Sequence, residues 1–177
     1  MEKISIIYLV LPCYNEEQVI EDSAEKLKVL MDDLKEKERI STESRVLFVD
    51  DGSTDSTWKL LQDICHDQSL FGAIKLAHNR GHQNALLAGM MTVKDSCDAV
   101  ITLDADLQHD ISAIPKFIEL YEQGNEVVYG IRQSRNGESG FKRFTGDAFY
   151  GLMEMLGTKE SMSLLSQLKK IVMLGRQ

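Results

Sequence analysis

Apolar and polar positions alternate along the chain in two different periods. Nearly continuous apolar runs are typical of strands covered on both faces, and they occupy residues 4–11, 46–49, 73–76, 99–103 and 127–131. Between these runs the period becomes helical. In residues 16–37, Ile20, Ala24, Leu27, Met31 and Leu34 share one stripe, with acids and lysines opposite.

Further helices are expected around the apolar positions Trp58, Leu61 and Ile64, at 83–94 and at 116–123, where Pro115 precedes the start and Gly124 ends the helix. The chain from about Phe141 onward is also expected to be helical. This alternation predicts a doubly wound α/β fold with a mostly parallel sheet. We expect one domain over residues 1–156 and a helical tail over 157–177.

Polar residues gather where the predicted strands end. Such clusters follow all five strands, at residues 12–16, 50–55, 79–83, 104–108 and 132–135. One cluster of this kind is explained by turn chemistry, since turns favour Asp, Gly, Ser and Asn. Five clusters on one edge of a sheet indicate a ligand site, because ligands of doubly wound folds bind beyond the carboxyl ends of the strands.

Asp104, Asp106 and Gln108 form the clearest candidate metal site. Residues two apart in an extended segment point to the same side, so their oxygens are expected to face one point. Oxygen ligands suit Mg²⁺ or Mn²⁺, and a diphosphate with water completes the coordination. The competing interpretation is a solvent-exposed acidic turn, which would be favoured for an isolated pair of aspartates. The apolar strand before Asp104 and the presence of Gln108 favour the metal.

Two other clusters offer groups for a nucleoside. Asp50 and Asp51 can accept a base N–H or ribose hydroxyls, whereas Tyr14 offers an aromatic face and Glu16 a carboxylate. Each cluster has a purely structural alternative. Asp50 and Asp51 suit a helix-capping turn, and residues 15–17 suit a helix start with acids near its positive end.

Basic residues stand out against the overall charge of −8. Arg80 precedes a predicted helix N-terminus, where a phosphate can rest. His82 lies beside it and is interpreted as a surface residue without acid–base work. Arg132 and Arg135 can fork onto phosphate oxygens. Lys142 and Arg143 extend this patch or simply belong to a solvated loop.

The acidic composition, with a pI near 5.0, argues against nucleic acid as a partner. The three cysteines lack metal-ligand spacing and are expected to be reduced and structural. Cys13 is interpreted as a buried filler rather than a nucleophile. No apolar run approaches the about 20 residues of a membrane span, and no signal peptide opens the chain. We therefore expect a soluble, cytosolic chain that reaches a membrane only through a part not present.

Read together, the clusters resemble family 2 glycosyltransferases. The similarity is carried by Pro-Cys-Tyr-Asn-Glu, Val-Asp-Asp-Gly-Ser-Thr-Asp, Asn-Arg-Gly-His-Gln-Asn-Ala, Leu-Asp-Ala-Asp-Leu-Gln-His and Val-Val-Tyr-Gly-Ile-Arg, over about residues 4–155. Within that family the chain is most similar to polyprenyl-phosphate hexose synthases. That similarity depends on Asp-Leu-Gln-His and on the spacing of Arg132, Arg135 and Glu138.

The resemblance implies a GT-A fold and inverting transfer of a hexose from a UDP- or GDP-sugar to an acceptor, here a polyprenyl phosphate. It implies that Asp50 and Asp51 hold the base or ribose together with three residues of the first cluster, namely Pro12, Tyr14 and Glu16. It places Asp104, Asp106 and Gln108 at the metal and diphosphate. Arg132 and Arg135 would face the acceptor phosphate. Catalytic roles are accordingly expected for the two aspartates Asp104 and Asp106 and for the two arginines, and Arg80 and Asp104 are expected to contact the donor.

The chain departs from the family pattern in two places. Asp110-Ile111-Ser112 stands where many relatives have Pro-Pro-Glu, and the sequence ends at Gln177, with 157–177 not expected to match. We interpret the chain as C-terminally truncated, with the whole protein at the cytoplasmic face of a membrane. Homo-oligomerisation is left open.

Three alternatives follow for the function. A related enzyme would act on a saccharide hydroxyl, which needs a general base. A truncated module would bind the nucleotide sugar without turnover. A dinucleotide-dependent oxidoreductase predicts Gly-x-Gly-x-x-Gly after the first strand, where this chain has Leu-Pro-Cys-Tyr-Asn-Glu.

Overall fold

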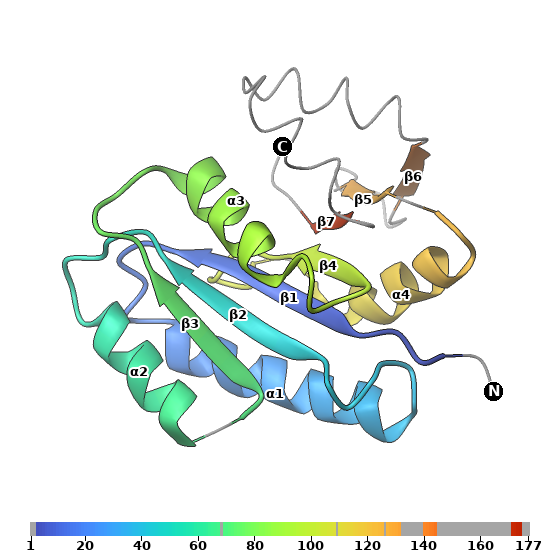
Figure 1. Ribbon diagram of the computed structural model, residues 1–177, viewed down its shortest axis with the longest axis horizontal. Helices are drawn as coiled ribbons and strands as arrows, with labels where there is room; N and C mark the ends of the chain where they lie inside the picture. The colour runs from blue at the N-terminus through green and yellow to red at the C-terminus, as the bar shows by residue number, and fades with distance from the viewer. Residues whose placement is uncertain are drawn as a thin grey trace.

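The computed structural model describes residues 3–67, 69–108, 110–125, 127–131, 140–144 and 171–174. Within this part of the chain, seven strands form one sheet in the order β3-β2-β1-β4-β7-β5-β6 (Figure 1). The strands are β1 (Ile7–Cys13), β2 (Arg45–Asp50), β3 (Phe71–Lys75), β4 (Ala99–Thr102), β5 (Val127–Ile131), β6 (Gly140–Phe144) and β7 (Ile171–Leu174). All neighbouring pairs are parallel except β5 and β6, which are antiparallel.

Helices cover both faces of the sheet. They are α1 (Ile20–Glu36), α2 (Thr57–Asp67), α3 (His82–Val93), the short 3₁₀ helix η1 (Ile111–Ala113) and α4 (Ile114–Glu122). Figure 1 shows α1 and α2 on one side of β1, β2 and β3 and α3 on the other. The predicted doubly wound α/β fold is therefore confirmed.

Alternate residues of β1 supply the cores on the two faces. Leu9 and Leu11 pack with the buried face of α1 and with α4, whereas Val10 packs with α3. This period of two is what a strand buried on both faces requires. The helix α3 approaches the sheet at Gly89, where an added Cβ would lie 2.5 Å from Val10 Cγ1 and 2.7 Å from Val49 Cγ2.

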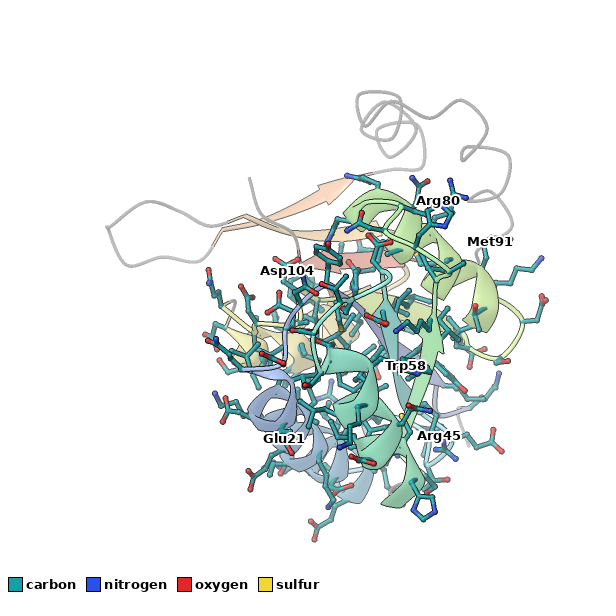
Figure 2. All side chains as sticks on the ribbon, turned by 90° about the vertical axis from the view of Figure 1, so that its left-hand side faces the viewer. Glu21, Arg45, Trp58, Arg80, Met91 and Asp104 are labelled. Carbon is teal, nitrogen blue, oxygen red and sulfur yellow. The ribbon has the colours of Figure 1, made fainter. Side chains whose placement is uncertain are left out.

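Order 3-2-1-4 places a topological switch point between β1 and β4, because the chain leaves β1 first toward β2 and β3 and later returns to its other side. In doubly wound folds the crevice at such a point, beyond the carboxyl ends of the strands, is where ligands bind. Figure 2 views the molecule from the end at which β1, β2 and β3 finish.

One expectation about the secondary structure is wrong. The chain from Phe141 was expected to be helical, but Gly140–Phe144 and Ile171–Leu174 are strands. The strand β7 lies between β4 and β5, and β6 pairs with the other edge of β5. Short apolar runs do not reveal by period whether they are strands or helices, and here pairing across the sheet decides. The proposed boundary at residue 156 stays a prediction.

The first helix also begins later than expected, at Ile20 instead of Glu16, because residues 15–17 are held in a loop by contacts with the segment after β2. None of the helices in the described ranges combines the length and the apolar character needed to cross a bilayer.

Candidate functional site

A cleft opens at the switch point, and segments following four strands line it. Its lining residues come from the ends of β1, β2 and β4 and from the turn before α3: Pro12, Cys13, Tyr14, Glu16, Asp51, Asn79, Gly81, His82, Asp104, Ala105 and Asp106. The first four predicted clusters thus meet at one place. The prediction that they share an edge of the sheet is confirmed by this arrangement.

The loops after β1 and β2 hold each other through reciprocal hydrogen bonds. The backbone N–H of Asn15 donates to Ser53 Oγ at 2.9 Å, and its side-chain Oδ1 accepts the N–H of Thr54 at 2.9 Å. The N–H of Glu16 donates to Thr57 Oγ1 at 2.8 Å. Asn15 adopts φ of 54°, a left-handed conformation that asparagine tolerates better than most residues. These contacts turn the chain so that Tyr14 and Glu16 line the cleft.

The adjacent carboxylates of Asp50 and Asp51 lie in different environments. Asp50 is fully buried and does not line the cleft; its Oδ1 accepts the N–H of Ser53 at 3.0 Å. The ammonium of Lys75 lies 3.3 Å from Asp50 Oδ2, although no hydrogen bond of good geometry reaches that oxygen within the described residues. Asp50 is therefore placed as a buried counter-charge, and its predicted contact with the nucleotide stays a prediction.

Asp51 lines the cleft, but its carboxylate is almost inaccessible, with 2% of the residue exposed. Oδ1 accepts the N–H of Arg80 at 2.7 Å and Oδ2 accepts the N–H of Gly81 at 2.8 Å. The side chain of Arg80 is exposed and is not among the lining groups (Figure 2). The structure thus brings the backbone of Arg80 to the site, while its guanidinium lies on the surface.

Two hydrogen bonds hold the turn after β4, which places Asp104 and Asp106 at the cleft. The N–H of Leu103 donates to the Val10 carbonyl at 3.1 Å, and buried Ser23 on α1 donates to the Ala105 carbonyl at 2.7 Å. Leu107 follows with φ of 45°, which is rare for a bulky residue and is compensated by packing of its side chain on the core.

The donor set at this turn fits a divalent cation that also binds a ligand. Asp104 and Asp106 both line the cleft, and the backbone N–H of Gln108 donates to Asp106 Oδ1 at 3.2 Å. Gln108 itself is exposed and does not line the cleft. Across the described ranges, no group of three His, Cys, Asp or Glu side chains is arranged to hold a metal. One or two carboxylates suffice for Mg²⁺ when substrate phosphates supply further oxygens.

His82 belongs to the site, although the sequence did not assign it a role there. It is the first residue of α3, lines the cleft, and places Nε2 at 4.0 Å from Asp104 Oδ1. Its position within the strand-end cluster 79–83, next to a predicted helix start, was the signal available. A single histidine in a polar segment is weak evidence for a functional site unless its contact with Asp104 is also known.

The remaining candidates are four basic residues and Cys13. Arg132 and Arg135 lie outside the described residues, and only the backbone of Lys142 and Arg143 is described, in β6. Cys13 is buried, and desolvation, with Glu16 and Asp50 adding to it, raises the pKa of its thiol far above the usual range. A protonated, buried thiol agrees with the interpretation of Cys13 as a filler.

Known proteins match this chain over most of its length. The family described as glycosyl transferase family 2 matches residues 8–172. The uncharacterized glycosyltransferase YkoT of Bacillus subtilis (strain 168) is 46% identical over 155 residues, which are 87% of this chain and 46% of that protein. The undecaprenyl-phosphate 4-deoxy-4-formamido-L-arabinose transferase of Edwardsiella ictaluri (strain 93-146) is 34% identical over 161 residues, or 90% of this chain and 46% of that protein.

Among solved structures, the mannosyltransferase PcManGT from Pyrobaculum calidifontis, in complex with GDP-Man and Mn²⁺, has a similar fold. The TM-score is 0.59 at 16% identity, covering 98% of this chain and 55% of that one. This likeness shows the GT-A fold. The chain spans about half the length of the curated relatives it matches.

The family match corrects one expectation. Residues 157–177 were expected to fall outside the resemblance, but the match continues to residue 172 and includes the first part of β7. The strand β7 pairs with β4 and β5 inside the sheet, so it belongs to the shared fold although its short sequence contains no recognisable motif. On the extent of this match and on the similarity to YkoT, the chain belongs to glycosyl transferase family 2.

Proposed function

We propose that the cleft binds a UDP- or GDP-sugar with Mg²⁺ or Mn²⁺, and that the hexose passes with inversion to a polyprenyl phosphate. The observation that carries this proposal is the convergence of four segments at the switch point. An aromatic ring, a glutamate and three aspartates line one cleft there. Turn chemistry explains each segment separately but gives no reason for them to face the same space.

The part of the cleft next to β1 and β2 is the proposed nucleoside site. Tyr14 is 44% exposed, so its ring is available to a base, and half-buried Glu16 lines the cleft with a carboxylate that can accept hydrogen bonds from ribose hydroxyls. Pro12 and Asp51 border the same region. Their positions are fixed by the hydrogen bonds between the two loops, which lowers the cost of ordering the site when a ligand binds.

Asp104 and Asp106 are the proposed ligands of the cation and neighbours of the donor diphosphate, and Gln108, which follows them in the chain, is a further proposed ligand of the cation. When bound, a divalent cation would offset the negative charge that develops on the departing nucleoside diphosphate. The chain holds both carboxylates on a turn anchored to β1 and α1. PcManGT, which has the same fold, is described with GDP-Man and Mn²⁺, in agreement with this assignment.

A lipid phosphate is the proposed acceptor. Such a nucleophile is already an anion and needs no general base, but it needs positive charge to approach the diphosphate. Arg132 and Arg135 are proposed to supply that charge. The Edwardsiella relative is named for transfer involving undecaprenyl phosphate. A lipid acceptor places the reaction at a membrane surface, and we propose its cytoplasmic face.

Binding without turnover is the second candidate. It is favoured by the cleft itself, because the groups that line it suit binding of a nucleotide sugar whether or not transfer follows. Release of nucleotide from the donor in the presence of polyprenyl phosphate would separate the two candidates.

Calorimetry with UDP, GDP and their sugars, with and without Mn²⁺, tests the donor site. We expect one nucleotide to bind in a metal-dependent manner, and Asp106→Ala to weaken that binding by at least about tenfold, a loss of about 1.4 kcal/mol. Asp32→Ala is a matched control, because Asp32 is an exposed aspartate of α1 paired only with Lys28 in the described ion pairs. Equal affinity of wild type and Asp106→Ala would remove the metal assignment.

A further inference from the structure

The imidazole of His82 lies beside the carboxylate of Asp104 without bonding to it. The distance from His82 Nε2 to Asp104 Oδ1 is 4.0 Å, which is too long for a hydrogen bond. Both residues line the cleft, and the side chain of His82 is 56% exposed, against 21% for that of Asp104. The space between the two atoms is therefore accessible to a molecule bound in the cleft.

The backbone, and not a bond to the ring, sets the position of His82. It is the first residue of α3 and follows Gly81, which has φ of +86°. The N–H groups of Arg80 and Gly81 donate to the Asp51 carboxylate at 2.7 Å and 2.8 Å, so the start of α3 is tied to the end of β2. Within the described ranges, the polar neighbour of the ring itself is Asp104. The ring is thus held at the cleft with Nε2 available to a ligand.

His82 and Asp104 have complementary hydrogen-bonding capacities. A carboxylate only accepts hydrogen bonds, whereas an imidazole presents an N–H at Nε2 when it is protonated and in one of its neutral tautomers. Since 4.0 Å is less than twice a hydrogen-bond length of about 2.8 Å, one oxygen atom can reach both groups. That oxygen must donate to Asp104 and accept from His82. A phosphate oxygen cannot donate and a ring N–H of a base cannot accept, but a hydroxyl group does both.

We propose that His82 and Asp104 together bind one hydroxyl group of the nucleotide sugar, which makes His82 a further substrate-binding residue. The inference rests on the proposed function, because it requires a nucleotide sugar in the cleft. The Asp104 carboxylate has about four lone-pair sites on two oxygens, so it can contact a cation and a hydroxyl at the same time. The ribose and the hexose both carry hydroxyl groups, and both are candidates for the one that is bound.

Three substitutions of His82 separate hydrogen bonding from the presence of a side chain. His82→Ala removes the ring, His82→Phe keeps a ring without nitrogen, and His82→Gln places an amide N–H₂ group at the end of a side chain of similar reach. With Mn²⁺ present, calorimetry should show about fivefold weaker binding of the nucleotide sugar by the first two variants, the size of one hydrogen bond between uncharged groups. His82→Gln should retain most of the affinity.

His78→Ala is the matched control for these variants. His78 is an exposed histidine of the same segment, but it does not line the cleft. We expect its substitution to leave nucleotide affinity unchanged. Because the side chains of both histidines are exposed, all of these variants should unfold near the wild-type temperature, which thermal unfolding checks.

Ligands that lack a hydroxyl group identify the one that is bound. If it belongs to the ribose, its removal in the 2′-deoxy or 3′-deoxy nucleoside diphosphate should weaken binding to the wild type by about fivefold more than binding to His82→Ala. The two changes are then non-additive, because both remove the same hydrogen bond. If the hydroxyl belongs to the hexose, His82→Ala should bind the nucleotide sugar more weakly but the nucleoside diphosphate as well as the wild type does.

Three results overturn the inference. The first is equal affinity of the wild type and His82→Ala for the nucleotide sugar, and the second is a loss in His82→Ala that is the same for all of these ligands. The third is a higher Mn²⁺ requirement for nucleotide binding by His82→Ala, which would make His82 a ligand of the cation. If the wild-type chain binds neither UDP, GDP nor their sugars, the proposed function fails and the inference fails with it. Normal wild-type binding with an unaffected His82→Ala variant rejects the inference alone.

Discussion

The buried hydroxyl of Ser23 on α1 donates a 2.7 Å hydrogen bond to the carbonyl oxygen of Ala105, the residue between Asp104 and Asp106. Ser23 is 1% exposed and Ala105 is 2% exposed, so water does not replace this bond when it is lost. The contact ties the carboxylate turn to a helix whose buried face belongs to the core. The position of the two aspartates thus depends on a residue outside the cleft.

Ser23→Ala is expected to weaken Mn²⁺-dependent nucleotide binding. An unpaired buried carbonyl costs about 1–3 kcal/mol, and relaxation of the turn would move the carboxylates from the positions they share with a cation. Ser44→Ala is a matched control, because Ser44 is equally buried and accepts the N–H of Ile7 at the other end of β1. We expect both variants to lose stability in thermal unfolding, but only Ser23→Ala to lose affinity. Equal nucleotide affinity in the two variants would contradict a role for Ser23 in the site.

Arg135→Ala is expected to spare nucleotide affinity and to slow transfer to a lipid phosphate. The reason is the proposed division of the site, in which the aspartates of the cleft hold the donor and the arginines after β5 hold the acceptor. Calorimetry with the nucleotide and a transfer assay with a short polyprenyl phosphate measure the two parts separately. A loss of nucleotide affinity would move Arg135 to the donor site.

The positions of the donor-site segments were predictable from the sequence because they depend on one rule. In parallel α/β sheets the carboxyl ends of the strands share an edge, so the clusters after residues 4–11, 46–49, 73–76 and 99–103 had to lie near each other. What the rule does not give is the partner of each side chain. Ser53 and Thr57 bind the backbone of the neighbouring loop, although they have the same polar character as ligand-binding residues.

The different fates of Asp50 and Asp51 follow from strand geometry. Consecutive residues at the end of an extended strand point to opposite sides, so two adjacent carboxylates do not both face one ligand.

The strands β6 and β7 were not predictable in the same way. Their pairing with β5 and β4 depends on segments far apart in the chain, which no local period reports.

Gly89→Ala is expected to destabilise the fold despite the better helix propensity of alanine. The new methyl group would lie 2.5 Å from Val10 Cγ1 and 2.7 Å from Val49 Cγ2, and both valines are fully buried. Overpacking typically costs about 1–3 kcal/mol, against a propensity gain of about 1 kcal/mol. The net loss of about 1 kcal/mol corresponds to a melting temperature about 2–4 °C lower. Gly72→Ala is the control, with only an ordinary 3.7 Å contact to Leu47, and is expected to be neutral or stabilising.

Asp55 makes the stability of the contact between the loops after β1 and β2 depend on pH. Desolvation raises the pKa of its carboxyl, but hydrogen bonds from Thr57 and from the N–H of Glu17 outweigh this and leave the pKa below its usual value. Because the folded pKa is depressed, the stabilisation is present above the unfolded pKa and is lost as pH falls through the folded pKa. Asp55→Asn should therefore be less stable than wild type at neutral pH, and the gap should narrow at acidic pH. A gap that stays constant down to pH values well below the unfolded pKa would show that ionisation of Asp55 does not contribute.

The buried charge of Asp50 depends on Lys75, which makes Lys75→Met a sharp test of this pair. The ammonium is 3.3 Å from Asp50 Oδ2 and lies 5.5 Å from the ring centre of Trp58. Removing one partner of a fully buried pair costs about 3–5 kcal/mol, and because Lys75 is 36% exposed we expect a smaller loss of about 1–3 kcal/mol. Methionine keeps an unbranched apolar side chain at this position, so the change removes mainly the charge.

Chemical denaturation of five variants, with Asp50→Asn among them, completes this test. Lys75→Arg should retain most of the stability, and Lys59→Met, which removes a lysine from the exposed side of α2, should have little effect. In the double variant Asp50→Asn with Lys75→Met, the loss should be smaller than the sum of the single losses, because no uncompensated carboxylate remains. If Lys75→Met unfolds at the wild-type denaturant concentration, the carboxylate of Asp50 does not need this cation, and its burial must be compensated by Ser53 and its neighbours instead.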